Sequence, residues 1–140
     1  MENVSKHITL DEATNSNTAI RNGINNNPDS VTFERMKLVA NKCFEPLREW
    51  YGKPIKINSF YRSQLLNTKV GGSATSQHCK GEAIDISAGS KVENKKLFDW
   101  ICANLDFDQC IHEYGDKTGP DWVHVSYKKV NNRKQILHIK

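Results

Sequence analysis

Apolar residues recur at steps of three and four between positions 30 and 51, the spacing that places them on one face of an α-helix. This spacing predicts the main core helix of the chain. Pro46 lies inside the segment, where it lacks a backbone donor and crowds the preceding turn, so we expect a bend or break at residues 42–46. The members of the stripe are Phe33, Met36, Val39, Ala40, Cys43, Phe44, Leu47 and Trp50.

Four later segments alternate apolar and polar residues, which is typical of strands. The last part of the chain, 130–139, contains Asn131-Asn132, a pair that tolerates positive φ, so we expect a closing hairpin with the preceding strand. A second helical stripe begins after Ser90 and ends near Leu105. These patterns predict an α+β fold with a central antiparallel sheet flanked by helices. The four strand-like segments are 55–60, 83–87, 109–114 and 122–127.

The first thirty residues are polar and rich in asparagine. Within them, Asp11 and Ser16 are candidate N-caps of two short helical turns that precede the core or pack on it. A chain of 140 residues is long enough for one compact domain and too short for two of ordinary size. We therefore expect a single domain over residues 1–140 with one functional site.

Charge, cysteine content and the N-terminal sequence narrow the function classes. The net charge is +4, from 20 basic and 16 acidic residues that are scattered rather than gathered in a patch, so we expect no nucleic-acid partner. A mild positive charge fits contact with an anionic cell wall, although solubility is the plainer interpretation. The four cysteines form no Cys-x-x-Cys pair, so free thiols are expected. Without an apolar leader or spanning run, we expect cytoplasmic synthesis, no membrane insertion and a monomer.

His78 and Asp85 are the first candidates for chemistry, because they lie on a predicted turn and on the strand that follows it. The period of two within that strand places Asp85 on the face opposite its isoleucine neighbours. A catalytic zinc takes three protein ligands and leaves a fourth position for water. The third candidate ligand is His124, which shares one face of a later strand with Trp122.

Beyond these spacings, the chain resembles a known family. The pattern Ser76-x-His78-x-x-Gly81-x-Ala83-x-Asp85, followed by Asp121-x-x-His124, resembles the signature of the zinc D-alanyl-D-alanine peptidases. These are peptidoglycan peptidases of the M15 group, which shares its fold with hedgehog signalling domains. The chain is most similar to the short single-domain members of phages and gut bacteria. The likeness extends roughly from Leu10 to the C-terminus and includes the segments 59–63, 67–73 and 122–127.

The resemblance implies that His78, Asp85 and His124 bind one Zn²⁺ ion, and that Asp121 is the general base. A carboxylate beside the zinc-bound water can take its proton and pass it to the leaving amine. In an ideal strand, however, residues three apart point to opposite faces, so Asp121 and His124 share a site only if the chain bends there. Glu113, one strand earlier, is the reserve general base.

Three more residues are candidates for the site. The family resemblance implies a role for Arg62, whereas Ser76 and Trp122 have two interpretations each. Arg62 matches the arginine that such enzymes place near the scissile carbonyl, where its guanidinium binds a substrate carboxylate or stabilises the oxyanion. Ser76 either binds substrate or caps its loop. Trp122 either lines the substrate groove or packs in the core. His112, by contrast, is expected to pack or to lie at the edge of the site.

The function implied is a zinc-dependent peptidoglycan peptidase that hydrolyses an amide bond next to D-alanine in stem peptides. It would act as a D-Ala-D-Ala carboxypeptidase or as an endopeptidase such as a phage endolysin. Release at lysis or delivery by a phage would bring a protein without an export signal to the cell wall. The alternative is a non-catalytic zinc-containing module of the hedgehog-like fold that binds the cell wall or a protein. Arg62 and a carboxylate at position 121 argue against that alternative, because a pure binder needs neither.

Overall fold

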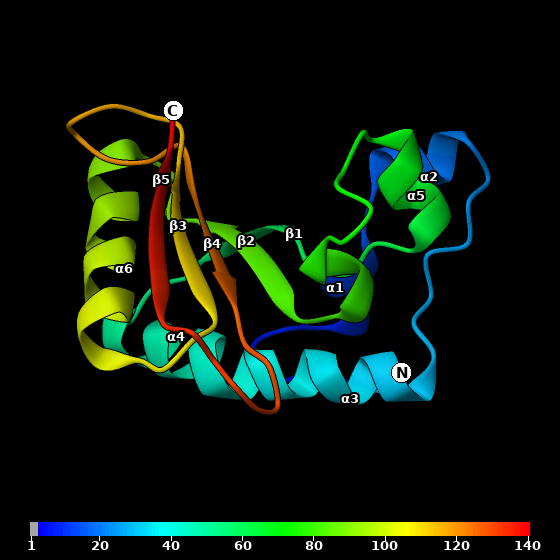
Figure 1. The fold of residues 1–140 in the computed structure, drawn as a ribbon, viewed down its shortest axis with the longest axis horizontal. Helices are drawn as coiled ribbons and strands as arrows, with labels where there is room; N and C mark the ends of the chain where they lie inside the picture. Colours follow the sequence, from blue (N-terminus) through cyan, green and yellow to red (C-terminus); the bar gives the residue numbers. More distant parts are fainter. Residues whose placement is uncertain (1–2) are drawn as a thin grey trace.

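A mixed sheet of five strands, in the order β1-β2-β4-β3-β5, carries the fold in residues 3–140, the part of the chain that the structure describes (Figure 1). The structure is a computed structural model. Neighbouring strands are antiparallel except β3 and β5, which are parallel. The strands are β1 (Lys56–Ser59), β2 (Ala83–Ser87), β3 (Gln109–Glu113), β4 (Trp122–Ser126) and β5 (Gln135–Ile139).

The α+β prediction is confirmed, but the expected closing hairpin between β4 and β5 is wrong. β4 lies between β2 and β3 in the sheet, so both of its hydrogen-bonding edges are occupied. β4 occupies only one edge of β3, so β5 pairs with the other edge, in parallel register with Ile111 opposite Leu137. Positive φ at Asn131 and Lys134 turns the connecting chain toward that edge. The asparagine pair therefore marks a turn, as expected, but the turn is part of a crossover.

The predicted core helix is a continuous run of three segments. α3 (Ser30–Val39) leads into a π-helical turn, η1 (Ala40–Phe44), and α4 (Glu45–Tyr51) follows. The deformation lies just before Pro46, as expected, because proline cannot supply the next α-helical hydrogen bond and the wider turn accommodates it.

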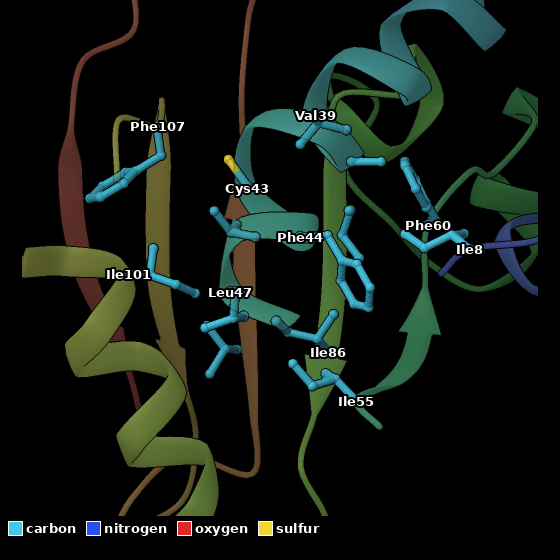
Figure 2. Packing of buried hydrophobic residues seen from close by; sticks show 14 of the residues in the cluster. Ile8, Val39, Cys43, Phe44, Leu47, Ile55, Phe60, Ile86, Ile101 and Phe107 are labelled. Carbon is cyan, nitrogen blue, oxygen red and sulfur yellow. The ribbon is translucent and has the colours of Figure 1, made fainter. Parts of the chain in front are cut away.

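A hydrophobic core lies between this helical run, the sheet and α6 (Lys91–Asn104). Figure 2 shows Phe44 and Leu47 beside Ile86 of β2, with Ile101 of α6 on the other side of the cluster. Alternation along β2 and β4 directs Ile84, Ile86, Val123 and Val125 into this core. The intervening residues of both strands are therefore presented on the opposite face of the sheet.

The N-terminal segment packs on this core and fixes the chain that follows β1. It contains α1 (Leu10–Thr14) and α2 (Asn17–Arg21). Ser16 caps α2 as predicted, whereas Thr9, and not Asp11, caps α1. The backbone N–H of Tyr61 donates to the carbonyl of Ala13 at 3.0 Å. This contact ties the start of the chain to the segment that carries Arg62.

Strand directions bring several segments to one end of the sheet. Because β1, β2, β4 and β3 are antiparallel in turn, the end of β1, the start of β2, the end of β4 and the start of β3 lie together. β5 begins at the same end, because it runs parallel to β3 (Figure 1). Two short helices, α5 (Gln64–Lys69) and the 3₁₀ turn η2 (Gln77–Lys80), connect β1 to β2 there. No helix among residues 3–140 combines the length and the apolarity that a bilayer crossing requires.

Candidate metal centre

Three side chains meet on the face of the sheet opposite the core: His78 from η2, Asp85 from β2 and His124 from β4. Their ligand atoms all lie within 4.8 Å of one another. Asp85 and His124 are direct cross-strand partners, which places both side chains on one face. The Nδ1 atom of His124 lies 2.9 Å from Oδ1 of Asp85, and Nε2 of His78 lies 3.2 Å from Oδ2.

The position of His78 is fixed by its backbone neighbours. Its Nδ1 atom lies 2.7 Å from the carbonyl oxygen of Phe60, so this nitrogen carries the proton and donates. Its backbone N–H donates to the hydroxyl of Ser76, which caps η2, and its carbonyl accepts from the backbone N–H of Arg62. The ring is 3% exposed and therefore has little freedom to turn.

Gly81 ends η2 and lets the chain enter β2 closely packed on α3. Its φ is +73°, in the left-handed region that disfavours residues with a Cβ. An added Cβ would also lie 2.8 Å from the side chain of Met36 and 2.9 Å from the carbonyl oxygen of Thr32. The glycine of the sequence pattern is thus explained by backbone conformation and by space.

The donor set of the cluster fits zinc. Because Nδ1 of a neutral His78 donates to Phe60, its Nε2 presents a lone pair to Asp85. Burial raises the pKa of Asp85, but hydrogen bonds donated by His124 and by the protonated form of His78 outweigh burial and hold the pKa well below its ordinary value. A lone pair facing an ionised carboxylate is repulsive unless a cation lies between them. Two imidazole nitrogens and one carboxylate oxygen are a ligand set that catalytic zinc uses.

Glu113 of β3 lines the same hollow as the cluster, which has a volume of about 960 Å³. Glu113 pairs with Trp122 of β4, two residues along the strands from the pair of Ile111 and His124. Burial raises the pKa of Glu113; His124 acts to lower it and the negative charge of Asp85 to raise it. This carboxylate is therefore close enough to the cluster to interact with it electrostatically.

Asp121, the general base implied by the family resemblance, is not among the residues that line this hollow. It lines a second hollow, together with Lys95 of α6 and with His112 and His138 from the core face of the sheet. The chain bends at Asp121, as the resemblance requires, but the bend does not bring Asp121 to the cluster: its backbone N–H donates to the carbonyl of Glu113 at 2.9 Å, and its side chain lines the second hollow. Asp121 and His124 therefore line different hollows.

The remaining predicted residues lie around the cluster or behind the sheet. Arg62, Ser76 and Trp122 all line the hollow that contains the cluster. Arg62 donates weakly to the hydroxyl of Ser76, at 3.4 Å, and its Nε is buried without a hydrogen-bond partner. Ser76 is both a loop cap and a neighbour of that arginine. His112 stacks on His138 at 4.9 Å between ring centroids, on the other face, so it is a packing residue.

The sequence patterns do not reveal a further group in this hollow, Asp108 with Lys128 and Arg133. Asp108 directly precedes β3, and the two cations belong to the connection between β4 and β5. The pattern of apolar positions carries no signal for a polar residue just outside a strand. The two basic residues come together only through the crossover that was expected to be a hairpin.

Comparison with known proteins agrees with the geometry. Residues 6–126 match the family model described as Peptidase M15. The chain belongs to the peptidase M15 family. A curated relative, the zinc D-Ala-D-Ala carboxypeptidase of Streptomyces albus G, is 46% identical to this chain over 63 residues. That match covers 44% of this chain and 25% of the relative, so the chain spans about a quarter of the relative's length. The family match and the zinc peptidase relative agree with the cluster of His78, Asp85 and His124, whose donor atoms could hold a metal ion.

Proposed function

We propose that this chain hydrolyses an amide bond next to D-alanine in the stem peptides of peptidoglycan. The observation that carries the proposal is one hollow that contains the cluster of His78, Asp85 and His124 together with Glu113 and Arg62. The relative whose name records zinc and D-Ala-D-Ala carboxypeptidase activity supports this substrate class. Both carboxypeptidase and endopeptidase action agree with the cluster, and action on the cell wall after lysis or phage delivery stays a prediction.

The cluster supplies the metal ligands in this proposal. Zinc held there would lower the pKa of water and polarise the substrate carbonyl. His78 and His124 bind through nitrogen and Asp85 through oxygen. The carbonyl of Phe60 orients the ring of His78, as outer hydrogen bonds do for many histidine ligands. A ligand set held this firmly needs little rearrangement to bind the ion.

We assign the general base to Glu113 in place of Asp121. Glu113 faces the hollow and accepts a proton from the attacking water as the new carbon–oxygen bond forms. It then returns the proton to the leaving amine as the carbon–nitrogen bond breaks. Burial keeps its pKa above the ordinary value, which makes it a stronger base than an exposed carboxylate.

Arg62 is the group that binds the substrate's negative charge beside the cluster. Its buried Nε has no hydrogen-bond partner in the described residues, which leaves donors for a substrate oxygen. A guanidinium can bind a carboxylate through two parallel hydrogen bonds or stabilise the developing oxyanion. The hydroxyl of Ser76 accepts a weak hydrogen bond from this side chain, at 3.4 Å. Trp122, in the wall of the same hollow, offers an apolar surface to a substrate methyl group.

The test combines zinc content with cleavage of purified muropeptides. Wild-type protein should contain one equivalent of zinc after metal loading and release a D-alanine-containing fragment, detected by mass spectrometry. His124→Ala should lose both properties, because it removes one of three ligands. The matched control is His112→Ala, which removes a histidine from the other face of the sheet and should retain zinc and cleavage. A zinc-loaded wild type that cleaves no stem peptide would instead support a binding module.

A further inference from the structure

Two cations converge on one buried carboxylate in the wall of the substrate hollow. Arg133 donates to Asp108 through Nε at 2.9 Å, through one terminal nitrogen at 2.7 Å and through its backbone N–H at 3.1 Å. The ammonium of Lys128 lies 3.4 Å from the same carboxylate. The side chain of Asp108 is 0% exposed, whereas those of Lys128 and Arg133 are 31% and 53% exposed.

This arrangement leaves one positive charge uncompensated, because two cations share one anion. The Asp108 carboxylate also accepts a hydrogen bond from the side-chain nitrogen of Gln77 at 3.1 Å, so its hydrogen-bonding capacity is fully occupied. The remaining donors are the second terminal nitrogen of Arg133 and hydrogens of the Lys128 ammonium. Because Asp108 holds the guanidinium at several points, an anion that binds these donors does not have to order the arginine first.

The cation pair lies in the same hollow as the metal cluster and Arg62. Gln77, which contacts Asp108, is the residue directly before the ligand His78. Arg62 follows β1 and Arg133 precedes β5, and these strands form the two edges of the sheet. Arg62 donates to Ser76, and Asp108 accepts from the adjacent Gln77, so both cationic positions are linked to the turn that carries His78.

We infer that Lys128 and Arg133 form a second carboxylate-binding subsite, for a substrate carboxylate other than the group that Arg62 binds. The inference rests on the proposed function, because the metal cluster in the same hollow marks where the bond is cut. A peptide with carboxylates both within the chain and at its C-terminus satisfies both subsites. The same peptide with an internal carboxylate amidated satisfies only one.

The experiment measures KM and kcat on a pair of stem peptides that differ in a single internal group, carboxylate or carboxamide. For wild type, amidation of the group that binds here should raise KM about tenfold and leave kcat nearly unchanged. Lys128→Gln should show a similarly raised KM on the carboxylate peptide and little further loss on amidation. The variant keeps the Arg133–Asp108 pair intact, so it should remain folded.

The matched control is Lys129→Gln, which makes the same charge change one residue further on, at an exposed position outside the hollow. It should retain the wild-type preference for the carboxylate peptide. Binding of both peptides to the zinc-loaded Glu113→Gln variant, measured by calorimetry, gives the same comparison without turnover. Here too, the carboxylate peptide should bind more tightly, and Lys128→Gln should remove the difference.

The outcomes separate this inference from the proposed function. If wild type cleaves the peptides and is indifferent to amidation of every internal carboxylate, the subsite does not exist while the peptidase assignment stands. An equal loss in Lys128→Gln and Lys129→Gln would show a general charge effect and would overturn the subsite as well. If wild type neither binds nor cleaves any stem peptide, both the function and the subsite are rejected.

Discussion

Glu113 and Asp121 are joined by a backbone hydrogen bond of 2.9 Å, yet their side chains line different hollows. The bond aligns two antiparallel strands just before the turn between them. Glu113 is presented to the metal cluster, whereas Asp121 lies beside α6, where Asn94 donates to its backbone carbonyl at 2.9 Å. Of these two neighbouring carboxylates, only Glu113 lines the hollow that contains the cluster.

Replacing Glu113 by Gln should abolish most of the peptidase activity. The amide is nearly isosteric with the carboxylate but cannot accept a proton, and general base catalysis typically contributes 10²–10⁴-fold. We expect kcat on a muropeptide to fall by a factor in that range, with zinc content unchanged. The measurement is steady-state kinetics on metal-loaded protein alongside metal analysis.

Asp121→Asn is the matched control for that experiment, because it makes the same chemical change on the other face of the sheet. It should alter kcat by less than about threefold, an effect below 1 kcal/mol. If Asp121→Asn lost activity to the same degree and Glu113→Gln kept it, the base would be Asp121. That result would mean that the side chain of Asp121 moves into the hollow of the cluster when substrate binds.

The metal cluster could be predicted from the sequence because its geometry is mostly local. Asp85 and His124 lie on short alternating strands, and β2 and β4 pair directly, so one face of the sheet receives both. The family resemblance supplied the pairing of these segments, which spacing alone does not give. The position of Asp121 illustrates the limit of a motif: the three-residue spacing to His124 suggested a shared site, whereas alternation argued against it.

The place of β5 could not be predicted, because it depends on the order of the other strands. A turn-forming pair such as Asn131-Asn132 predicts reversal of the chain, and the nearest strand is the default partner. Here β4 has no free edge, so the chain crosses to β3. The contact of Arg133 with Asp108, 25 residues apart, arises from this crossover and leaves no local pattern.

Gly81→Ala should destabilise the protein by about 2–3 kcal/mol, from left-handed backbone strain plus overpacking against Met36 and Thr32. Gly52→Ala separates the two effects, because Gly52 has the same φ of +73° with nothing within 4 Å of an added Cβ. That control should cost only about 1 kcal/mol. Denaturant unfolding of the two variants measures both values. Equal losses of stability in the two variants would show that the structure around Gly81 relaxes to accommodate the added methyl group.

The Asp108 carboxylate should make stability depend on pH in the acid range. Its hydrogen bonds to Arg133 hold its pKa well below the ordinary value near 4 in the folded state. Because the folded pKa is depressed, the stabilisation is complete above pH 4–5 and is lost as the pH falls through the folded pKa. Asp108→Asn should therefore be about 2 kcal/mol less stable than wild type at pH 7, and the difference should shrink at lower pH.

Urea titrations of wild type and Asp108→Asn at a series of pH values between 7 and 2 measure this difference. Asp116→Asn is the control: that carboxylate pairs with Lys91 but is 56% exposed. Exposed ion pairs contribute little, so this variant should stay within about 1 kcal/mol of wild type at pH 7. A pH-independent difference between wild type and Asp108→Asn would show that packing, and not charge, accounts for the loss.

Removal of zinc should lower the stability of the protein without unfolding it. The metal cluster lies on a sheet whose opposite face is packed on the core, so the fold has support that small zinc-dependent domains lack. Binding to the folded state alone contributes about 2.7 kcal/mol at a free zinc concentration 100 times the dissociation constant. We expect thermal unfolding in chelator to remain cooperative, at a lower Tm than in zinc. His124→Ala should show the same Tm in both solutions, and His112→Ala should keep the shift; a zinc-dependent Tm in His124→Ala would place the ion elsewhere.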